Sequence, residues 1–198
     1  MNTSSICEYI EKNFSEKRKI HTEGVRTTAM KLAEKYGAHM EDPAAFIEKA
    51  ELAALFHDMY RGVPVDVLNY YVKHLNLDEK RYKDNPNLAH GKIAAIVMER
   101  DFDVKDRDII NAVSYHTTGR PEMSLLEKII YIADAVEPSR AYPGVQALRQ
   151  TLEEDLDRAV LLSLTNTINY IRGEKKFLDE DTVLAREYFE KKINHKGE

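Results

Sequence analysis

The amino-acid sequence predicts an all-α fold, and three observations lead to this prediction. The 198 residues include only 8 glycines and 6 prolines, so few positions interrupt regular structure. Most segments between them repeat apolar residues at intervals of three and four, the period of an amphipathic helix. No internal repeat, low-complexity tract or linker divides the chain. We therefore expect one helical bundle over residues 1–198, with a core at about 16–140 and C-terminal helices at about 144–192 packed on it.

Capping residues place the first three helices. The Ser5–Glu8 spacing is that of a capping box and predicts a helix beginning near residue 6. A second helix is predicted over about 16–36, where a glycine follows. The Asp42–Pro43 pair predicts the start of the third, because proline suits the first helical turn. This helix is apolar nearly all round over 50–56, as expected for the central helix of a bundle.

The later helices follow from the same period. Segments rich in turn residues, such as DNPN, HTTGRPEM, EPSRAYPG and RGEKKFLDED, separate them. We place these helices at about 65–75, 88–100, 105–116, 124–136 and 152–171, and the last begins near Asp181.

Composition excludes several classes of protein. The net charge is −5 and the basic residues are scattered, which disfavours nucleic-acid and membrane-surface binding. Cys7 is the only cysteine, so neither an intrachain disulfide nor a zinc–thiolate cluster can form. No apolar run has the length of a signal peptide or of a membrane span. We expect a soluble, cytoplasmic protein.

Four histidines and two aspartates are predicted to point into the core. His57 continues the apolar stripe of Ala50, Ala53 and Ala54, and Asp134 continues that of Leu126 and Ile130. The same helical spacing turns three further histidines inward: His21, His90 and His116. Asp58 follows His57 directly, within the stretch LFHDMYRG.

Two interpretations of this inward-facing set compete. A single histidine on an apolar face is commonly a core residue with its own hydrogen-bond partner. Six such groups on five helices would each need a separate buried partner, whereas a shared metal centre satisfies all of them. We therefore favour a metal centre. His39, His74 and His195 lie in polar surroundings and are given no such role.

The order His21, His57–Asp58, His90, His116, Asp134 resembles the HD-domain metallophosphohydrolase superfamily, with the two extra histidines of members that hold two metals. Longer matches resemble the YqeK-type symmetrical dinucleoside-tetraphosphatases of bacteria over nearly the whole chain. They are RKIHTEGV, AHGKIAA, YHTTGRPEMSLLEKIIYIADAVEPSR, GVQALR and DTVLAREYF.

This resemblance implies a fold, an activity and a set of site residues. It implies an HD-domain bundle around a dinuclear centre that hydrolyses diadenosine tetraphosphate to two ADP. Asp58 would bridge one site of His21, His57 and Asp134 and another of His90 and His116. Asp58 and His57 are taken as the catalytic residues. The implied nucleotide contacts are Arg18, Arg61, Thr117, Arg140, Phe177 and Leu178.

Two departures from the family pattern affect the expected nucleotide contacts. Arg61 occupies the position, three residues after Asp58, where the family usually has lysine. A planar guanidinium therefore replaces a compact ammonium group there. The segment KKFLDEDT, which contains Phe177, stands where the family usually has an isoleucine-histidine-proline motif.

The residues themselves indicate phosphate chemistry. Two metals about 3.5–4 Å apart acidify a bridging water and clamp phosphoryl oxygens. Arg18 lies three residues before His21 on the same helical face, and arginine is well shaped for bidentate phosphate contact. Imidazole and carboxylate ligands suit iron, manganese, cobalt or zinc. Iron is what the resemblance adds.

Three other functions remain open at this point. An HD-type hydrolase of a deoxynucleoside triphosphate or a guanosine alarmone is the nearest alternative. A di-iron oxygenase would not need the repeated arginines, and a non-catalytic HD module often lacks ligands that are present here. The sequence leaves monomer and homodimer open.

Overall fold

The computed structural model describes residues 3–195, and within them the chain forms eleven α-helices and no strand. This confirms the predicted all-α class. The helices are α1 (Ser4–Asn13), α2 (Glu16–Gly37), α3 (Pro43–Phe56), α4 (Val65–His74), α5 (Glu79–Tyr82), α6 (Pro86–Asp101), α7 (Arg107–Tyr115), α8 (Leu125–Val136), α9 (Val145–Glu154), α10 (Leu156–Gly173) and α11 (Glu180–His195).

Helix starts agree with the sequence where a side chain caps them. Asp42 accepts a hydrogen bond from the Ala45 amide (3.0 Å) at the start of α3. The capping box predicted at Ser5–Glu8 is wrong, because α1 already begins at Ser4 and its N-cap residue, Thr3, makes no side-chain capping bond. A complete capping box instead opens α8.

The helix predicted over 152–171 is confirmed as α10 from residue 156 onward, but its predicted start is wrong, since two helices meet there. Asp155 adopts an extended conformation, φ −155° and ψ 123°, between α9 and α10. Its carboxylate accepts from the Arg158 amide (2.8 Å) and so begins a new helix. Apolar residues continue across this break, so periodicity alone merges the two helices. The single turn of α5 also escaped prediction, because four residues carry no period.

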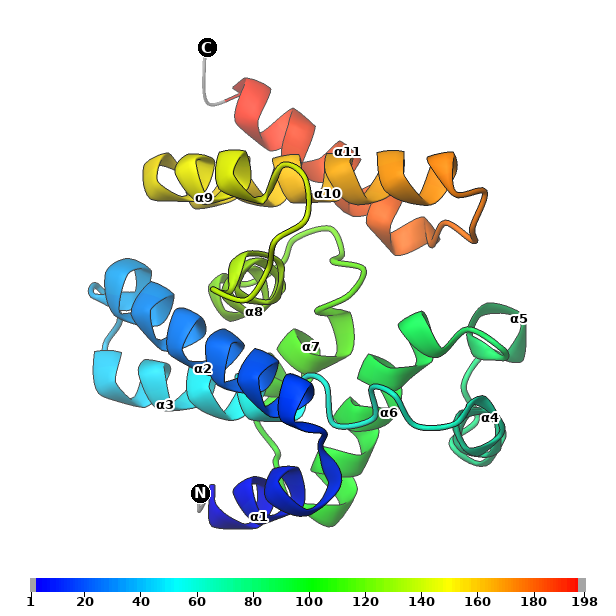
Figure 1. Ribbon diagram of the computed structural model, residues 1–198. Helices are drawn as coiled ribbons and strands as arrows, with labels where there is room; N and C mark the ends of the chain where they lie inside the picture. Colours follow the sequence, from blue (N-terminus) through cyan, green and yellow to red (C-terminus); the bar gives the residue numbers. More distant parts are fainter. Residues whose placement is uncertain (1–2, 196–198) are drawn as a thin grey trace.

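The arrangement of the helices places α8 between two groups (Figure 1). On one side α8 packs on α2, α3 and α7, and on the other it packs on α9 and α10. Ile129, Ile130 and Ile132 of α8 are fully buried. The third helix, α3, is buried from Ala50 to Phe56 except for Glu51 and contacts α1, α2, α6, α7 and α8, as a central helix should. No helix within residues 3–195 is long and apolar enough to cross a membrane.

Candidate metal centre

The six side chains predicted as metal ligands lie together where five helices meet. His21 is on α2, His90 on α6 and Asp134 on α8, while His57 and Asp58 follow α3 directly and His116 follows α7 directly. Five of them line a cleft of about 530 Å³, which we call the metal cleft, and His57 lies fully buried beside Asp58. The cleft is also lined by Ser15, Lys17, Arg18, Arg61, Thr117, Glu137, Ser139, Arg140, Ala141 and Tyr142.

The His57–Asp58 pair is positioned by the end of α3. The helix stops at Phe56, although the His57 amide still donates to the Ala53 carbonyl (3.0 Å). The next residues form a turn in which the Arg61 amide donates to the Asp58 carbonyl (2.9 Å). Gly62 then has φ +81°, a left-handed conformation that favours glycine and directs the chain away. The apolar helix therefore ends by delivering two polar side chains to the cleft.

Asp58 lies between two pairs of histidines. Its Oδ2 atom is 3.6 Å from His21 Nε2 and 3.8 Å from His57 Nε2. Its Oδ1 atom is 3.2 Å from His90 Nε2 and 3.9 Å from His116 Nε2. Each carboxylate oxygen thus faces a different pair, as a carboxylate bridging two metals would. Asp134 joins the first pair, with Oδ1 at 3.1 Å from His21 Nε2.

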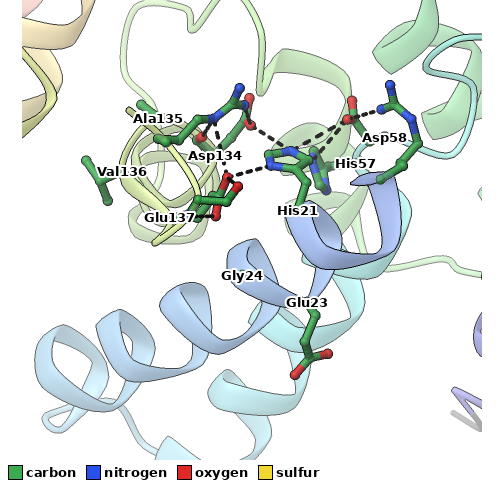
Figure 2. Close-up of polar contacts among 12 residues, drawn as sticks. His21, Glu23, Gly24, His57, Asp58, Asp134, Ala135, Val136 and Glu137 are labelled. Carbon is green, nitrogen blue, oxygen red and sulfur yellow. Dashed lines mark hydrogen bonds and ion pairs between the residues drawn. The ribbon is translucent and has the colours of Figure 1, made fainter. Parts of the chain in front are cut away.

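The Nδ1 contacts fix the tautomer of each histidine. His57, His90 and His116 donate from Nδ1 to the carbonyls of Ala54 (2.6 Å), Pro86 (3.0 Å) and Val113 (2.7 Å). His21 donates from Nδ1 to a Glu137 oxygen (2.9 Å; Figure 2). A neutral imidazole with Nδ1 protonated carries its lone pair on Nε2.

The Nε2 atoms nevertheless face one another. The Nε2 atoms of His57 and His21 lie 3.4 Å apart, and those of His90 and His116 lie 3.0 Å apart. Two lone pairs cannot form a hydrogen bond, whereas a cation between them satisfies both. The residues therefore fit a metal centre with imidazole and carboxylate donors, in two groups that share Asp58.

Electrostatics keep this donor set ready for a cation. Burial lowers the pKa of His57 and lowers the pKa of His116 to about 3, so both rings are neutral at pH 7. Burial raises the pKa of Asp58, but the imidazoles of His57 and His90 outweigh it and hold the pKa well below the usual value. For Asp134, His21 and the nearby Arg140 likewise outweigh burial and keep the pKa low. For His57 and His116, these are the protonation states that metal ligands require. Burial lowers the pKa of His21, but Asp134 and Glu137 outweigh it and raise the pKa, so a bound metal would take the place of a proton there.

Two of the predicted phosphate ligands contact these carboxylates directly. Arg18 Nη1 donates to Asp58 Oδ2 (2.5 Å), and Arg140 donates to Asp134 through Nη2 and to its carbonyl through Nε (2.8 Å). Thr117 lies beside the centre, with Oγ1 at 3.2 Å from His116 Nε2.

The remaining predicted contacts divide between two clefts. Arg61 and Thr117 line both the metal cleft and a second cleft of about 720 Å³. Phe177 lines only this second cleft, and half-buried Leu178 is not among the residues that line either. The second cleft lies between Lys80–Leu88 and the α10–α11 segment, and its other lining residues from that segment are Thr167, Tyr170, Ile171, Lys176, Asp179 and Thr182.

Sequence reasoning missed three residues that shape the centre. Glu137 is 1% exposed and contacts Nδ1 of His21, the ring nitrogen that faces away from Asp58, and no pattern in the sequence marks it. A Cβ atom at Gly24 would lie 2.5 Å from Glu137 Oε2, so this glycine admits the carboxylate. A Cβ atom at Gly91 would lie 2.9 Å from His116 Cε1, so glycine there lets α6 approach the ligand.

Comparisons with known proteins agree with this geometry. The model of the HD domain family matches residues 18–139. A Bacillus subtilis protein named symmetrical bis(5'-nucleosyl)-tetraphosphatase is 38% identical over 93% of this chain and 96% of its own length. A protein of the same name from Halalkalibacterium halodurans is 34% identical over 92% of this chain and 94% of its own length.

A solved structure extends the similarity to the whole fold. A crystal structure from Clostridium acetobutylicum, described as a predicted HD superfamily hydrolase involved in NAD metabolism, has 38% identity and a TM-score of 0.87. The match covers 97% of this chain and 98% of that one. The chain therefore belongs to the HD-domain family, within the group of its relatives named symmetrical bis(5'-nucleosyl)-tetraphosphatases.

Proposed function

We propose that this protein hydrolyses diadenosine tetraphosphate symmetrically, yielding two ADP. The observation that carries the proposal is the histidine and aspartate cluster around Asp58, which opens into a cleft lined by arginines. The relatives that match over more than nine-tenths of this chain are named for this reaction, which favours it over hydrolysis of a deoxynucleoside triphosphate or an alarmone. We further propose two iron ions as the metals and the cytoplasm as the location.

The reaction breaks one bond of the polyphosphate chain. A water oxygen adds to one of the two central phosphorus atoms, and that phosphorus loses its bond to the central bridging oxygen. The bridging oxygen leaves with the other half, so each product is a nucleoside diphosphate, and two protons are released. The metals, when bound, acidify the water and clamp the phosphoryl oxygens.

The ligand residues would divide as two overlapping sets. His21, His57 and Asp134 would hold one metal, His90 and His116 the other, and Asp58 both. All six donors are fixed by helix ends or by hydrogen bonds, so they are organised before substrate binds.

The arginines supply positive charge in an acidic protein. Arg18 and Arg140 each use part of the guanidinium on a carboxylate, which leaves further N–H donors for phosphate oxygens. Within residues 3–195, no hydrogen bond or ion pair engages the Arg61 guanidinium. An unpaired cation at the junction of the two clefts is well placed to hold the middle of a tetraphosphate.

The second cleft offers a place for a nucleoside beyond the phosphates. Tyr170 and Phe177 are 60% and 56% exposed there, beside Lys176, and exposed aromatic rings can stack on a base. Because this wall comes from α10 and α11, it also supports the proposal that the C-terminal helices belong to the same domain as the metal centre.

Product analysis tests the proposal. Protein loaded with iron or manganese is incubated with diadenosine tetraphosphate in water enriched in ¹⁸O, and the products are separated by ion exchange. We expect ADP alone, with one ¹⁸O in half of the molecules. A mixture of ATP and AMP, or no product from protein shown to hold two metals, would contradict the proposed function.

A further inference from the structure

Glu137 contacts the metal centre from behind. It follows α8 directly, three residues after Asp134, and its side chain is 1% exposed. One carboxylate oxygen accepts from His21 Nδ1 (2.9 Å), and this contact joins residues 116 apart in the chain (Figure 2). A carboxylate buried this deeply is costly unless its oxygens are satisfied.

Neighbouring residues hold this carboxylate in one position. The Ser139 hydroxyl donates to Oε1 (2.5 Å) and the Ser139 amide donates to Oε2 (2.6 Å). On the opposite side, the backbone of Gly24 comes so close that no side chain fits between it and the carboxylate. Glu137 therefore has one available orientation, and in it His21 Nδ1 is a partner.

His21 differs in this respect from the other three histidines. Their Nδ1 atoms donate to carbonyls three or four residues earlier in the chain, so local backbone orients those rings. The His21 ring alone is oriented by a side chain, and by one that is anionic. An imidazole that donates to a carboxylate becomes a more basic ligand through its other nitrogen than one that donates to a neutral carbonyl.

We propose that Glu137 is a positioning residue that orients His21 and makes the His21 side of the centre the tighter of the two metal sites. This inference rests on the proposed two-metal centre. Asp134 strengthens the asymmetry, because its carboxylate lies on the same side. Among residues 3–195, the site of His90 and His116 has only the shared Asp58 as an anionic donor.

The test is a metal titration of the metal-free, full-length protein. Co²⁺ binding is followed by calorimetry and by its visible absorption spectrum in wild type and in Glu137→Gln. The amide keeps the shape of the side chain but loses its charge and one of its two acceptors. We expect two binding steps in wild type, and in the variant a loss of about 10- to 100-fold in the affinity of the tighter step alone.

A matched control separates positioning from a loss of structure. Glu23 lies two residues from His21 on the same helix but points away from the cluster and pairs with Arg26, so Glu23→Gln should leave both steps unchanged (Figure 2). Thermal unfolding of each metal-free variant checks its fold. A His116→Ala background, which removes a ligand of the other site, should leave one step that Glu137→Gln still weakens.

The outcomes separate this inference from the proposed function. Equal weakening of both steps, or no change in either, would overturn the role of Glu137 and leave the two-metal centre in place. A wild-type protein that binds no metal would overturn both.

Discussion

The metal cleft and the second cleft meet at Arg61 and Thr117, yet they are built in different ways. In the metal cleft, Asp58, His90 and His116 are each less than a tenth exposed and are fixed by helix ends and backbone carbonyls. The aromatic residues of the second cleft are more than half exposed. The core thus fixes the metal cleft, while a few polar contacts hold the second cleft, where we propose that a nucleoside binds. We expect changes at the first to affect kcat and metal content, and changes at the second to affect KM.

Asp58→Ala should have the largest effect. It removes the carboxylate that faces both histidine pairs, so both metal sites lose an anionic donor. We expect turnover of diadenosine tetraphosphate to fall at least about a thousandfold, the upper range for removal of one electrostatic group, together with metal content. Elemental analysis and ADP release measure the two effects. His74→Ala, at an exposed histidine outside both clefts, is the control, and full metal content with full turnover in Asp58→Ala would disprove the assignment.

Arg61→Ala probes the junction of the clefts. Because the guanidinium has no partner within the described part of the chain, its loss should leave the thermal midpoint unchanged. We expect kcat/KM to fall about 10- to 100-fold, as for one charge-assisted hydrogen bond. Arg61→Lys should recover part of this loss, because it restores the charge without the fork. Steady-state kinetics provide the measurement, and a kcat/KM equal to that of wild type in Arg61→Ala would remove this residue from the site.

Arg81→Lys probes the wall of the second cleft. From α5, Arg81 donates to Asp179, which is 1% exposed, and to Asp181 in the first turn of α11. Lysine keeps the charge but cannot bond both carboxylates in the same fork geometry, so the wall should loosen. We expect KM to rise about 3- to 10-fold with kcat nearly constant, since about one neutral-strength hydrogen bond is lost. Arg100→Lys, at an exposed ion pair, is the control. A fall in kcat with no change in KM would count against the assignment of kcat to the metal cleft and KM to the second cleft.

The residues of the metal cleft could be predicted from the sequence far better than those of the second cleft. His57, His90 and His116 continue apolar stripes, so helical period alone turns each of them toward the core. Glu137 gives no such signal, because its partner lies 116 residues away in the chain and only the packing of α2 on α8 joins them. The same limit applies to Arg81, whose contacts cross about 100 residues. Period and capping report local structure, whereas a contact between distant elements depends on how the helices pack.

The smallest expected effect concerns the ion pairs that connect the helices of the metal cleft to those of the second cleft. Asp157 on α10 pairs with Lys128 of α8 (2.8 Å) and with Lys192 of α11 (2.9 Å), so it ties the helix that carries Asp134 to the helices that form the second cleft. Burial raises the pKa of Asp157, but the two lysines outweigh it and hold the pKa at about 2, below the usual 3.8. The folded state therefore binds fewer protons than the unfolded state between these values, and the stabilisation is complete above about pH 4 and is lost as the pH falls towards 2. Allowing for solvent screening, Asp157→Asn should lower the free energy of unfolding by about 1–2 kcal/mol at pH 7. Urea unfolding of both proteins at pH 7 and at pH 3 measures the difference, which should shrink at the lower pH while turnover at pH 7 changes little. An equal difference at both pH values would mean that packing, and not the charge of Asp157, holds α8 to the C-terminal helices.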